Sequence, residues 1–449
     1  MMQTLRHIKG FRLNMSGKPA PEIDPLKDPQ TLGILPDRIS HITPRLLVKE
    51  GDMVNIGSLL FVDKQNPDFK FRSPGGGRIE EIRFGRRRRI REIVIRRDHQ
   101  ERFERFERLD AGQIKTASRE KIVSLLQEGG LWPLIRELPF RNIARPGSNP
   151  KGILVSLGSG EPFHPDPSAY LRDQEDLFNV GIESLKRLSV PVDIIVPKEV
   201  FPVPDWAIPY CRYAVEGGYP AGDPGLFLYH MKQSAEENLM WYVAGQDVLL
   251  IAELLSTGCY PIRKIMVVAG DAAGNPRHLV TRIGSPLAHI AGHDPGEGPV
   301  RIITGGIFTG YSDTEQHHVG YYESGLTMVF ERKEPEFLSL FKPGLDKPTY
   351  SRAFLSRIKT GGLRFDSDYH GEERACIGCG YCAEVCPVRI LPQFTFKAIL
   401  AKEIDEALAH GLLDCTECGL CSYVCPSKID LTEMMKQTRA GLFKELERR

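Results

Sequence analysis

The sequence predicts a multidomain α/β protein in which two β-rich units and one α/β unit accompany a small α-helical domain that binds metal. Three observations lead to this prediction. The 449 residues are about three times the roughly 150 residues of a typical domain. Near Pro150, short strands punctuated by glycine turns give way to strands that alternate with helices. Finally, eight of the ten cysteines lie between Cys376 and Cys425.

Composition excludes several classes of protein. Lys and Arg total 59 against 58 for Asp and Glu, so no overall field attracts nucleic acid, and we expect no nucleic-acid partner. No apolar stretch approaches the roughly 18 residues needed to cross a bilayer, and the first residues lack the apolar core of a signal peptide. We therefore expect a chain without a transmembrane segment that stays in the cytoplasm, where clustered cysteines indicate metal ligation rather than disulfides.

The first unit, residues 1–110, is expected to be β-rich, because glycine turns separate short strands in 48–60 and 73–79. The pattern resembles the biotinyl/lipoyl-type barrel-sandwich domain. That family attaches its cofactor to a lysine in a Met-Lys-Met turn, and Asn66 holds the corresponding position here. We therefore expect neither biotin nor lipoate.

The second unit, residues 111–265, is expected to be a Rossmann-like α/β domain. The predicted strands are 152–157, 192–196 and 264–269, and the predicted helices are 173–188 and 246–256. The loop 158–162 follows a strand and contains Gly158 and Gly160, so its N–H groups could meet a phosphate. No complete G-x-G-x-x-G follows, which favours a plain turn.

Residues 266–345 are assigned to a β-grasp-like (SLBB) domain, since 280–340 is again strand-like, and 346–370 to a connector. His317 and His318 are adjacent in this unit. Neighbours on a strand point to opposite faces, so we expect packing roles rather than a shared metal.

The last unit, residues 371–449, contains two copies of C-x2-C-x2-C-x3-C-P, at 376–387 and 415–426. This run is typical of ferredoxins that hold two 4Fe–4S clusters. Three cysteines surround one cluster, with Gly380 and Gly419 allowing close backbone approach, and the fourth reaches the other cluster where the following proline starts a helix. Helical periodicity at 393–410 and 431–446 favours a helical ferredoxin domain.

The expected ligands are therefore crossed between the motifs: Cys376, Cys379, Cys382 and Cys425 for the first cluster, and Cys415, Cys418, Cys421 and Cys386 for the second. The alternative is a pair of zinc sites, which usually use two separated C-x2-C pairs instead of three-plus-one runs.

Much of the chain up to about Arg364 resembles the NqrA family, whose members belong to the sodium-translocating NADH:quinone reductase. The resemblance rests on the stretches 51–54 to 73–74, 219–222, 237–242, 246–248, 267–270 and 275–277. It implies a peripheral protein on the cytoplasmic side of the inner membrane, with the other subunits of the complex as partners and an association with quinone. That family lacks two complete cluster motifs.

The C-terminal part is instead similar to the RnfC family of the Rnf ferredoxin:NAD oxidoreductase complex, whose members carry two 4Fe–4S clusters. That family holds FMN with a G-G-x-G-x-P loop. The corresponding stretch here, 129–133, has Leu131 and Trp132 in the space that glycines would leave open. The sequence therefore disfavours FMN and NADH binding.

Three functions follow from these features. The favoured one is an oxidoreductase subunit, incomplete as an enzyme alone, that relays single electrons through two clusters in an ion-translocating Nqr- or Rnf-type complex, to or from quinone. The second is an FMN-dependent NADH dehydrogenase. The third is a docking scaffold that its metal clusters only hold together.

Overall fold

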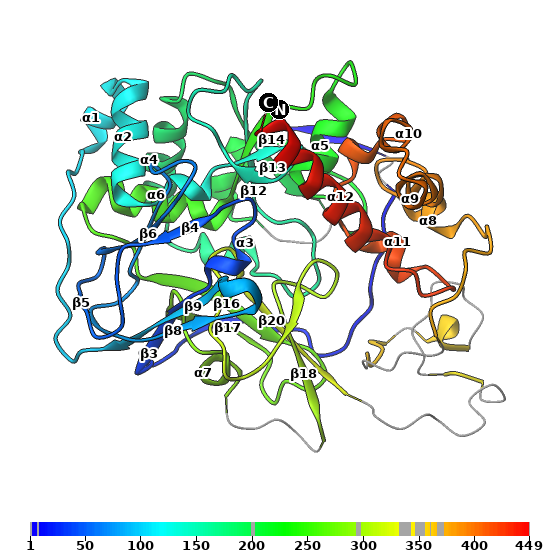
Figure 1. Cartoon of the computed structure of the whole chain (residues 1–449), viewed down its shortest axis with the longest axis horizontal. Coiled ribbons are helices and arrows are strands. Elements are labelled where there is room, and N and C mark those ends of the chain that lie inside the picture. The colour runs from blue at the N-terminus through cyan, green and yellow to red at the C-terminus, as the bar shows by residue number, and fades with distance from the viewer. Residues whose placement is uncertain are drawn as a thin grey trace.

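The computed structural model describes residues 2–6, 9–198, 203–292, 298–331, 343–345, 355–359, 361–365 and 372–448. The predicted connector 346–370 and the end of the strand-like segment 280–340 lie largely outside these ranges. The described residues form four sheets and a C-terminal group of helices (Figure 1).

The N-terminal module consists of two small antiparallel sheets, with strand orders β3-β9-β8-β5 and β4-β6-β7. Its elements are β3 (Thr31–Ile34), η1 (Pro36–Arg38), β4 (Pro44–Leu46), β5 (Met53–Val54), β6 (Leu59–Asp63), β7 (Lys70–Arg72), β8 (Gly77–Phe84), η2 (Arg86–Arg88) and β9 (Ile90–Arg97). Phe61 and Phe71 stack in its interior with ring centroids 4.5 Å apart. Asn66 lies in the turn between β6 and β7.

A seven-stranded sheet with order β1-β14-β13-β12-β15-β10-β11 forms the middle of the molecule. Its strands are β1 (Gln3–Leu5), β10 (Arg136–Leu138), β11 (Asn142–Ile143), β12 (Ile153–Ser156), β13 (Val192–Pro197), β14 (Cys211–Val215) and β15 (Met240–Ala244). The five strands from β1 to β15 run parallel. Every residue of β12 is buried, as expected for a central parallel strand covered on both faces.

Helices and short helical turns surround this sheet: α1 (Ala111–Thr116), α2 (Arg119–Gly129), η3 (Trp132–Leu134), α3 (Pro167–Tyr170), α4 (Glu175–Lys186), η4 (Asp205–Tyr210), α5 (Pro224–Met231) and α6 (Gly245–Thr257). The predicted helices 173–188 and 246–256 correspond to α4 and α6 and are confirmed. From β12 the chain adds β13 and then β14 on one side, and it later returns to add β15 on the other. The order therefore reverses between β12 and β15, where open α/β sheets usually bind ligands.

A six-stranded sheet has the order β19-β18-β20-β16-β17-β2. Its elements are β2 (Ala20–Pro25), β16 (Arg263–Ala269), β17 (Arg277–Arg282), α7 (Leu287–Ala291), β18 (Val300–Thr304), β19 (Tyr311–Asp313) and β20 (Gly325–Phe330). The strand predicted at 264–269 exists as β16, but its assignment to the α/β unit is wrong. It pairs antiparallel with β17 across a short loop, from Arg263 opposite Arg282 to Val268 opposite Arg277. A buried apolar run does not reveal which sheet receives it.

The N-terminus is shared between the larger sheets. β1 pairs in parallel with β14, and β2 pairs in parallel with β17. The beginning of the predicted 1–110 unit therefore lies outside the two small sheets. A buried ion-pair cluster also joins these parts, because Arg282 contacts Glu101 at 2.8 Å and Asp28 at 3.0 Å.

The C-terminal helices are η6 (Leu355–Ile358), α8 (Tyr381–Val385), α9 (Pro392–Ala401), α10 (Ile404–Ala409), η7 (Leu412–Asp414), α11 (Leu420–Tyr423) and α12 (Leu431–Leu446). The predicted helix 431–446 is confirmed as α12, whereas 393–410 is divided into α9 and α10 because Lys402 adopts a φ of 64°. Among the described residues, no helix combines the length and apolar character required to cross a membrane.

His317 and His318 have separate partners, as expected. His317 pairs with Asp313, and His318 Nδ1 lies 2.7 Å from Glu92 Oε1. They serve packing and ion pairing within their own surroundings.

Candidate redox centre

The two cysteine motifs share one local structure. Gly380 and Gly419 have φ values of 79° and 78°, a left-handed conformation that strains other residues, and each immediately precedes a short helix. The third cysteine of each motif therefore lies in the first turn of α8 or α11. A Cβ at Gly419 would also come within 2.5 Å of the Phe308 carbonyl oxygen, so this glycine permits close packing against the six-stranded sheet domain.

The prediction that a proline starts a helix after each motif is wrong. Pro387 and Pro426 lie in turns. The N–H of Arg389 donates to Cys386 O at 3.2 Å, and the N–H of Lys428 donates to Cys425 O at 3.1 Å. The helices that follow begin only at Pro392 and Leu431, because each chain segment first makes a turn with a positive φ at Arg389 or Lys428.

The fourth cysteine of each motif lies near the other motif. Burial raises the pKa of Cys386 to about 12, and the neighbouring Cys415 thiol contributes to the increase. Cys386 in turn is among the groups that raise the pKa values of Cys418 and Cys421, after burial itself. In the first motif, burial raises the pKa of Cys382, with Cys379 and Cys425 as additional causes. These proximities follow the crossed pattern.

The described residues contain no group of three or more His, Cys, Asp or Glu side chains in position to hold a metal ion. A 4Fe–4S cube binds each cysteine through a different iron atom, so its ligands stand farther apart than those of a single ion. The thiols are deprotonated when they bind metal. Because burial raises their pKa values, cluster assembly at the second motif must release protons.

Hydrogen bonds hold the second motif against the rest of the protein. Tyr219 donates from its hydroxyl group to Cys418 O at 2.8 Å, and Arg141 donates to Thr416 O at 3.0 Å. Arg439 of α12 is 2% exposed; it donates to Cys415 O at 2.5 Å and pairs with Glu417 at 2.8 Å. Two arginines therefore lie beside the cysteines of this motif, where they would offset the negative charge of a thiolate-ligated cluster.

A cavity of about 1050 Å³ extends from the carboxyl ends of β12 and β15 to this second motif. Its lining includes Arg38, Arg136, Arg141, Gly158, Ser159, Glu161, Tyr219, Tyr242, Asp247, Lys264, Tyr311, Tyr322, Glu323, Thr416 and Glu417. The predicted glycine loop 158–162 thus lines the cavity. The remaining lining residues follow no sequence motif, although Tyr219, Tyr242 and Asp247 belong to the stretches that carried the family resemblance.

Three buried acids give the cavity unusual electrostatics. Burial raises the pKa of Glu161 to about 7, against hydrogen bonds from the Phe308 N–H and the Thr309 hydroxyl group. Burial also raises the pKa values of Asp247 and Glu323. Perturbed acids in a large cavity at a sheet switch point are typical of a ligand site.

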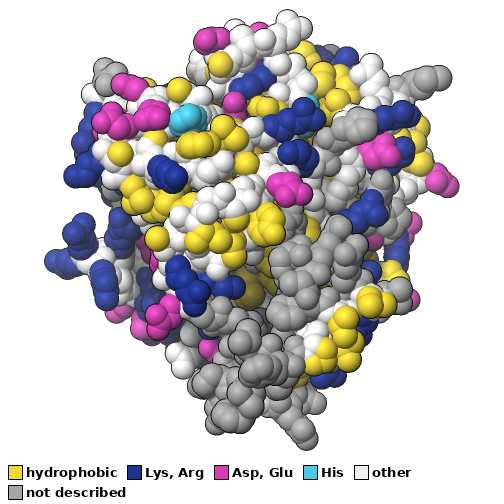
Figure 2. All heavy atoms as spheres, turned by 90° about the vertical axis from the view of Figure 1, so that its right-hand side faces the viewer, with side chains coloured by type: hydrophobic (Ala, Val, Ile, Leu, Met, Phe, Trp, Pro, Cys, Tyr) yellow, Lys and Arg dark blue, Asp and Glu magenta, His cyan; other side chains and the backbone are white. Residues whose placement is uncertain are grey.

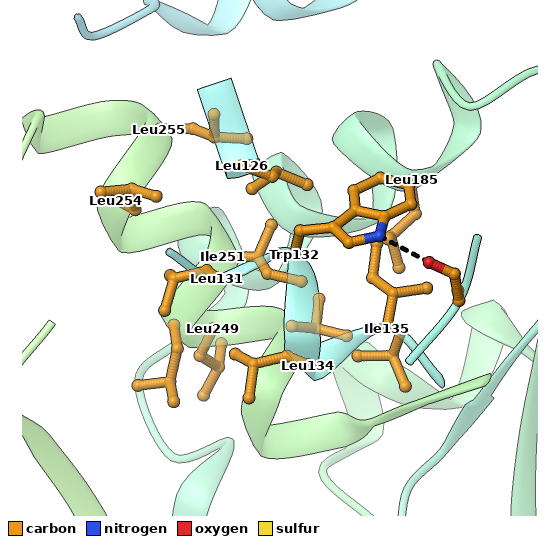
Figure 3. Close-up of a cluster of buried hydrophobic side chains, with 14 of the residues drawn as sticks. Leu126, Leu131, Trp132, Leu134, Ile135, Leu185, Leu249, Ile251, Leu254 and Leu255 are labelled. Carbon is orange, nitrogen blue, oxygen red and sulfur yellow. Dashed lines mark hydrogen bonds between the residues drawn. The ribbon is translucent and has the colours of Figure 1, made fainter. Parts of the chain in front are cut away.

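The stretch 129–133 is filled by side chains. Trp132 is fully buried, and its indole N–H donates to Ala144 O at 2.7 Å. Figure 3 shows it among leucine and isoleucine side chains from several elements, including Leu131 and Leu126. Its ring also meets that of Trp241 edge-on at 5.6 Å. The position where the glycine loop of a flavin site would lie is therefore part of the hydrophobic core.

Comparisons with known proteins agree with this architecture. Residues 5–98 match the family model of the NqrA N-terminal barrel-sandwich hybrid domain, residues 117–260 that of the NqrA second alpha/beta domain, and residues 375–429 that of a 4Fe-4S dicluster domain. The barrel-sandwich, α/β and iron–sulfur domains expected from the sequence are thus confirmed.

Curated relatives cover nearly the whole chain. The NqrA protein from the Na(+)-translocating NADH-quinone reductase of Yersinia pestis is 30% identical over 91% of this chain and 92% of the relative. That of Alcanivorax borkumensis is 28% identical over the same shares. An NAD+-reducing NiFe-hydrogenase in its H2-reduced state is 12% identical over 76% of this chain and 69% of the hydrogenase, with a TM-score of 0.36, too low to inform on fold or function.

The fold and the two motifs define a multidomain α/β protein with a C-terminal iron–sulfur domain. More particularly, the chain belongs to the NqrA family of the Na+-translocating NADH-quinone reductase.

Proposed function

We propose that this chain is a peripheral electron-transfer subunit of a membrane-bound, ion-translocating NADH:quinone oxidoreductase, and that it relays single electrons through two 4Fe–4S clusters. The observation that carries the proposal is the pair of identical motifs whose fourth cysteines lie beside the opposite motif. The names of the relatives support the complex, its sodium translocation and its quinone substrate for those proteins.

The donor set fits the clusters. Cys376, Cys379, Cys382 and Cys425 would hold one, and Cys415, Cys418, Cys421 and Cys386 the other. Each bound cluster would accept and donate one electron at a time. The protein's contribution is to anchor the loops, chiefly through Arg439 and Tyr219, and to exclude water from the second set, in which Cys386 and Cys421 are 6% and 8% exposed.

A quinone headgroup is the proposed ligand of the cavity, since aromatic side chains lie there beside hydrogen-bonding groups. Arg136 stacks over Tyr242 and Tyr322, with its guanidinium carbon 4.6 and 4.5 Å from the ring centroids. FMN and NADH are disfavoured because Trp132 occupies the flavin-loop position. The parallel sheet with its switch at β12 and β15 supports a Rossmann-like domain, and the mixed six-stranded sheet with α7 supports a β-grasp-like domain.

The proposed location is the cytoplasmic side of the inner membrane, where other subunits of an Nqr- or Rnf-type complex would hold the chain. Ion translocation would then belong to those partners. The same family membership supports this arrangement over a free soluble enzyme.

Anaerobic purification followed by iron, sulfide, zinc and flavin analysis tests the proposal. About eight irons per chain, without FMN, is the expected result, since two cubes hold four irons each. Stoichiometric FMN with NADH-driven cluster reduction would favour the dehydrogenase. Clusters that are present but cannot be reduced would favour the scaffold, and zinc without iron would overturn all cluster-based functions.

A further inference from the structure

The two cysteine sets have different surroundings. In the first motif Cys379 is exposed and its neighbour Ile377 is 70% exposed. No atom lies within 4 Å of the Cβ position at Gly378 or Gly380. The loop around the first set therefore lies open at the protein surface.

The second set lies inside the protein and beside the cavity. Thr416 and Glu417, between its first two cysteines, line the cavity, and so does Tyr219, which bonds to Cys418 O. Phe308 lies against Gly419 on another side. None of residues 376–387, all of which the structure describes, lines this cavity.

We propose that the cluster held by the second set exchanges electrons with the cavity ligand, and that the cluster held by the first set exchanges electrons with a one-electron redox protein docked on the outer face. This inference rests on the proposed function and adds an order to its two clusters. Electron transfer slows steeply with distance, so each cluster serves the reactant nearest to it.

The electron count is balanced for a quinone. In the direction of quinone reduction, an electron leaves the reduced centre of the partner protein, enters the outer cluster, passes to the inner cluster and reaches the quinone. Two such transfers, together with two protons from solvent, convert the quinone to a quinol, while the partner centre is oxidised twice.

The outer face has the apolar character that docking requires. α9 packs against the first motif, where the Cys382 thiol donates to Gln393 Oε1 at 3.3 Å. Large exposed hydrophobic side chains on this motif and on α9 are Ile377, Leu391, Phe394 and Leu400, at 70%, 42%, 46% and 59% exposure. Figure 2 views the side of the molecule that carries α8, α9 and α10, where hydrophobic side chains gather among scattered charges. A small apolar face beside a surface redox centre suits the brief contacts of electron-transfer proteins.

Electron paramagnetic resonance of the reduced full-length holoprotein tests the order. Cys425→Ser and Cys386→Ser, which alter one ligand of each cluster, identify the two signals. A soluble dysprosium chelate should accelerate the relaxation of the outer signal several-fold more than that of the inner signal. Ubiquinone-1, the probe for the cavity, should change the line shape of the inner signal alone.

Reduction kinetics test the docking face. The double variant Ile377→Glu and Phe394→Glu should slow cluster reduction by a reduced two-cluster ferredoxin at least tenfold, while dithionite reduction stays unchanged. The matched control is Leu446→Glu, an exposed apolar residue at the end of α12 (56% exposed), which should have no effect. A change in sedimentation with unaltered ferredoxin kinetics would assign the face to self-association and overturn the docking proposal.

Failure of this inference differs from failure of the proposed function. A protein without two clusters refutes the function itself. Two clusters whose inner signal responds to dysprosium, or whose outer signal responds to ubiquinone-1, refute only the order. An absence of any ubiquinone-1 effect on either signal also refutes the cavity part of the order.

Discussion

The hydroxyl group of Tyr219 donates a hydrogen bond to the carbonyl oxygen of Cys418 across 2.8 Å, which joins the cavity wall to the second cysteine motif. The Tyr219 ring also stacks on Phe308, with centroids 4.8 Å apart. One side chain thus connects the α/β sheet, the six-stranded sheet domain and the proposed inner cluster.

Tyr219→Phe should retain the stacking and lose the donor. We expect a loss of about 1 kcal/mol in stability and a more negative reduction potential for the inner cluster, because hydrogen bonds in the cluster's surroundings stabilise its reduced form. Redox titration followed by paramagnetic resonance measures both potentials. Tyr170→Phe removes a similar bond, to Leu157 O at 2.7 Å, and should leave both potentials unchanged. Equal shifts of both clusters in Tyr219→Phe would contradict the prediction.

Cys386→Ser tests the crossed ligand assignment. Because Cys386 lies beside Cys415, the serine should perturb or remove the cluster held by the second motif and leave the other signal intact. Cys425→Ser should do the reverse. Iron content and spectra of both variants provide the measurement, and loss of the first-motif cluster alone in Cys386→Ser would refute the crossed pattern.

Glu161 should make stability fall as pH rises. Burial raises its pKa in the folded protein to about 7, from the usual 4.5. Between these values the folded state holds a proton that the unfolded state has released, so the cost of ionising the buried group reaches about 3 kcal/mol above pH 7. Glu161→Gln keeps an acceptor for the Phe308 N–H and removes the titration. Urea unfolding from pH 5 to pH 8 should show the wild type losing stability relative to this variant; parallel curves would contradict the assignment.

Glu101 should have the opposite pH dependence. Burial alone would raise its pKa, but hydrogen bonds from Arg282, Arg97 and the Gly76 N–H hold it at about 2, below the usual 4.5. Its contribution, about 2 kcal/mol after allowance for screening by solvent, is present above pH 4.5 and is lost as pH falls toward 2. In urea unfolding, Glu101→Gln should be less stable than the wild type at pH 7 and should approach it at pH 3. A constant difference between the two proteins would exclude this titration.

Trp132→Ala should cost about 3 to 5 kcal/mol, because it leaves a large cavity in the core. Trp132→Phe keeps an aromatic ring and loses the N–H bond to Ala144 O, so its effect should be smaller. Urea unfolding monitored by circular dichroism separates the two variants. If Trp132→Ala were as stable as the wild type, the packing seen at 129–133 would not be a stability determinant.

The local features of the chain were predictable from its sequence, because they depend on residues close together. Examples are helix α12, helix α6 and the cysteine runs with their glycines. The sheet that receives β16 was not, since its partner β17 is set by a loop and not by its apolar pattern. The cavity was not predictable either: Tyr242, Lys264 and Glu323 carry no shared spacing and meet only when two sheets pack.

The pairing of β1 with β14 and of β2 with β17 has a consequence for synthesis. The first strands emerge from the ribosome long before their partners near residues 211–215 and 277–282. Their sheet edges must therefore wait unpaired through much of translation, and such late, long-range pairing slows folding and favours aggregation. The amino terminus is thus the last piece of each large sheet to settle, although it is the first to be made.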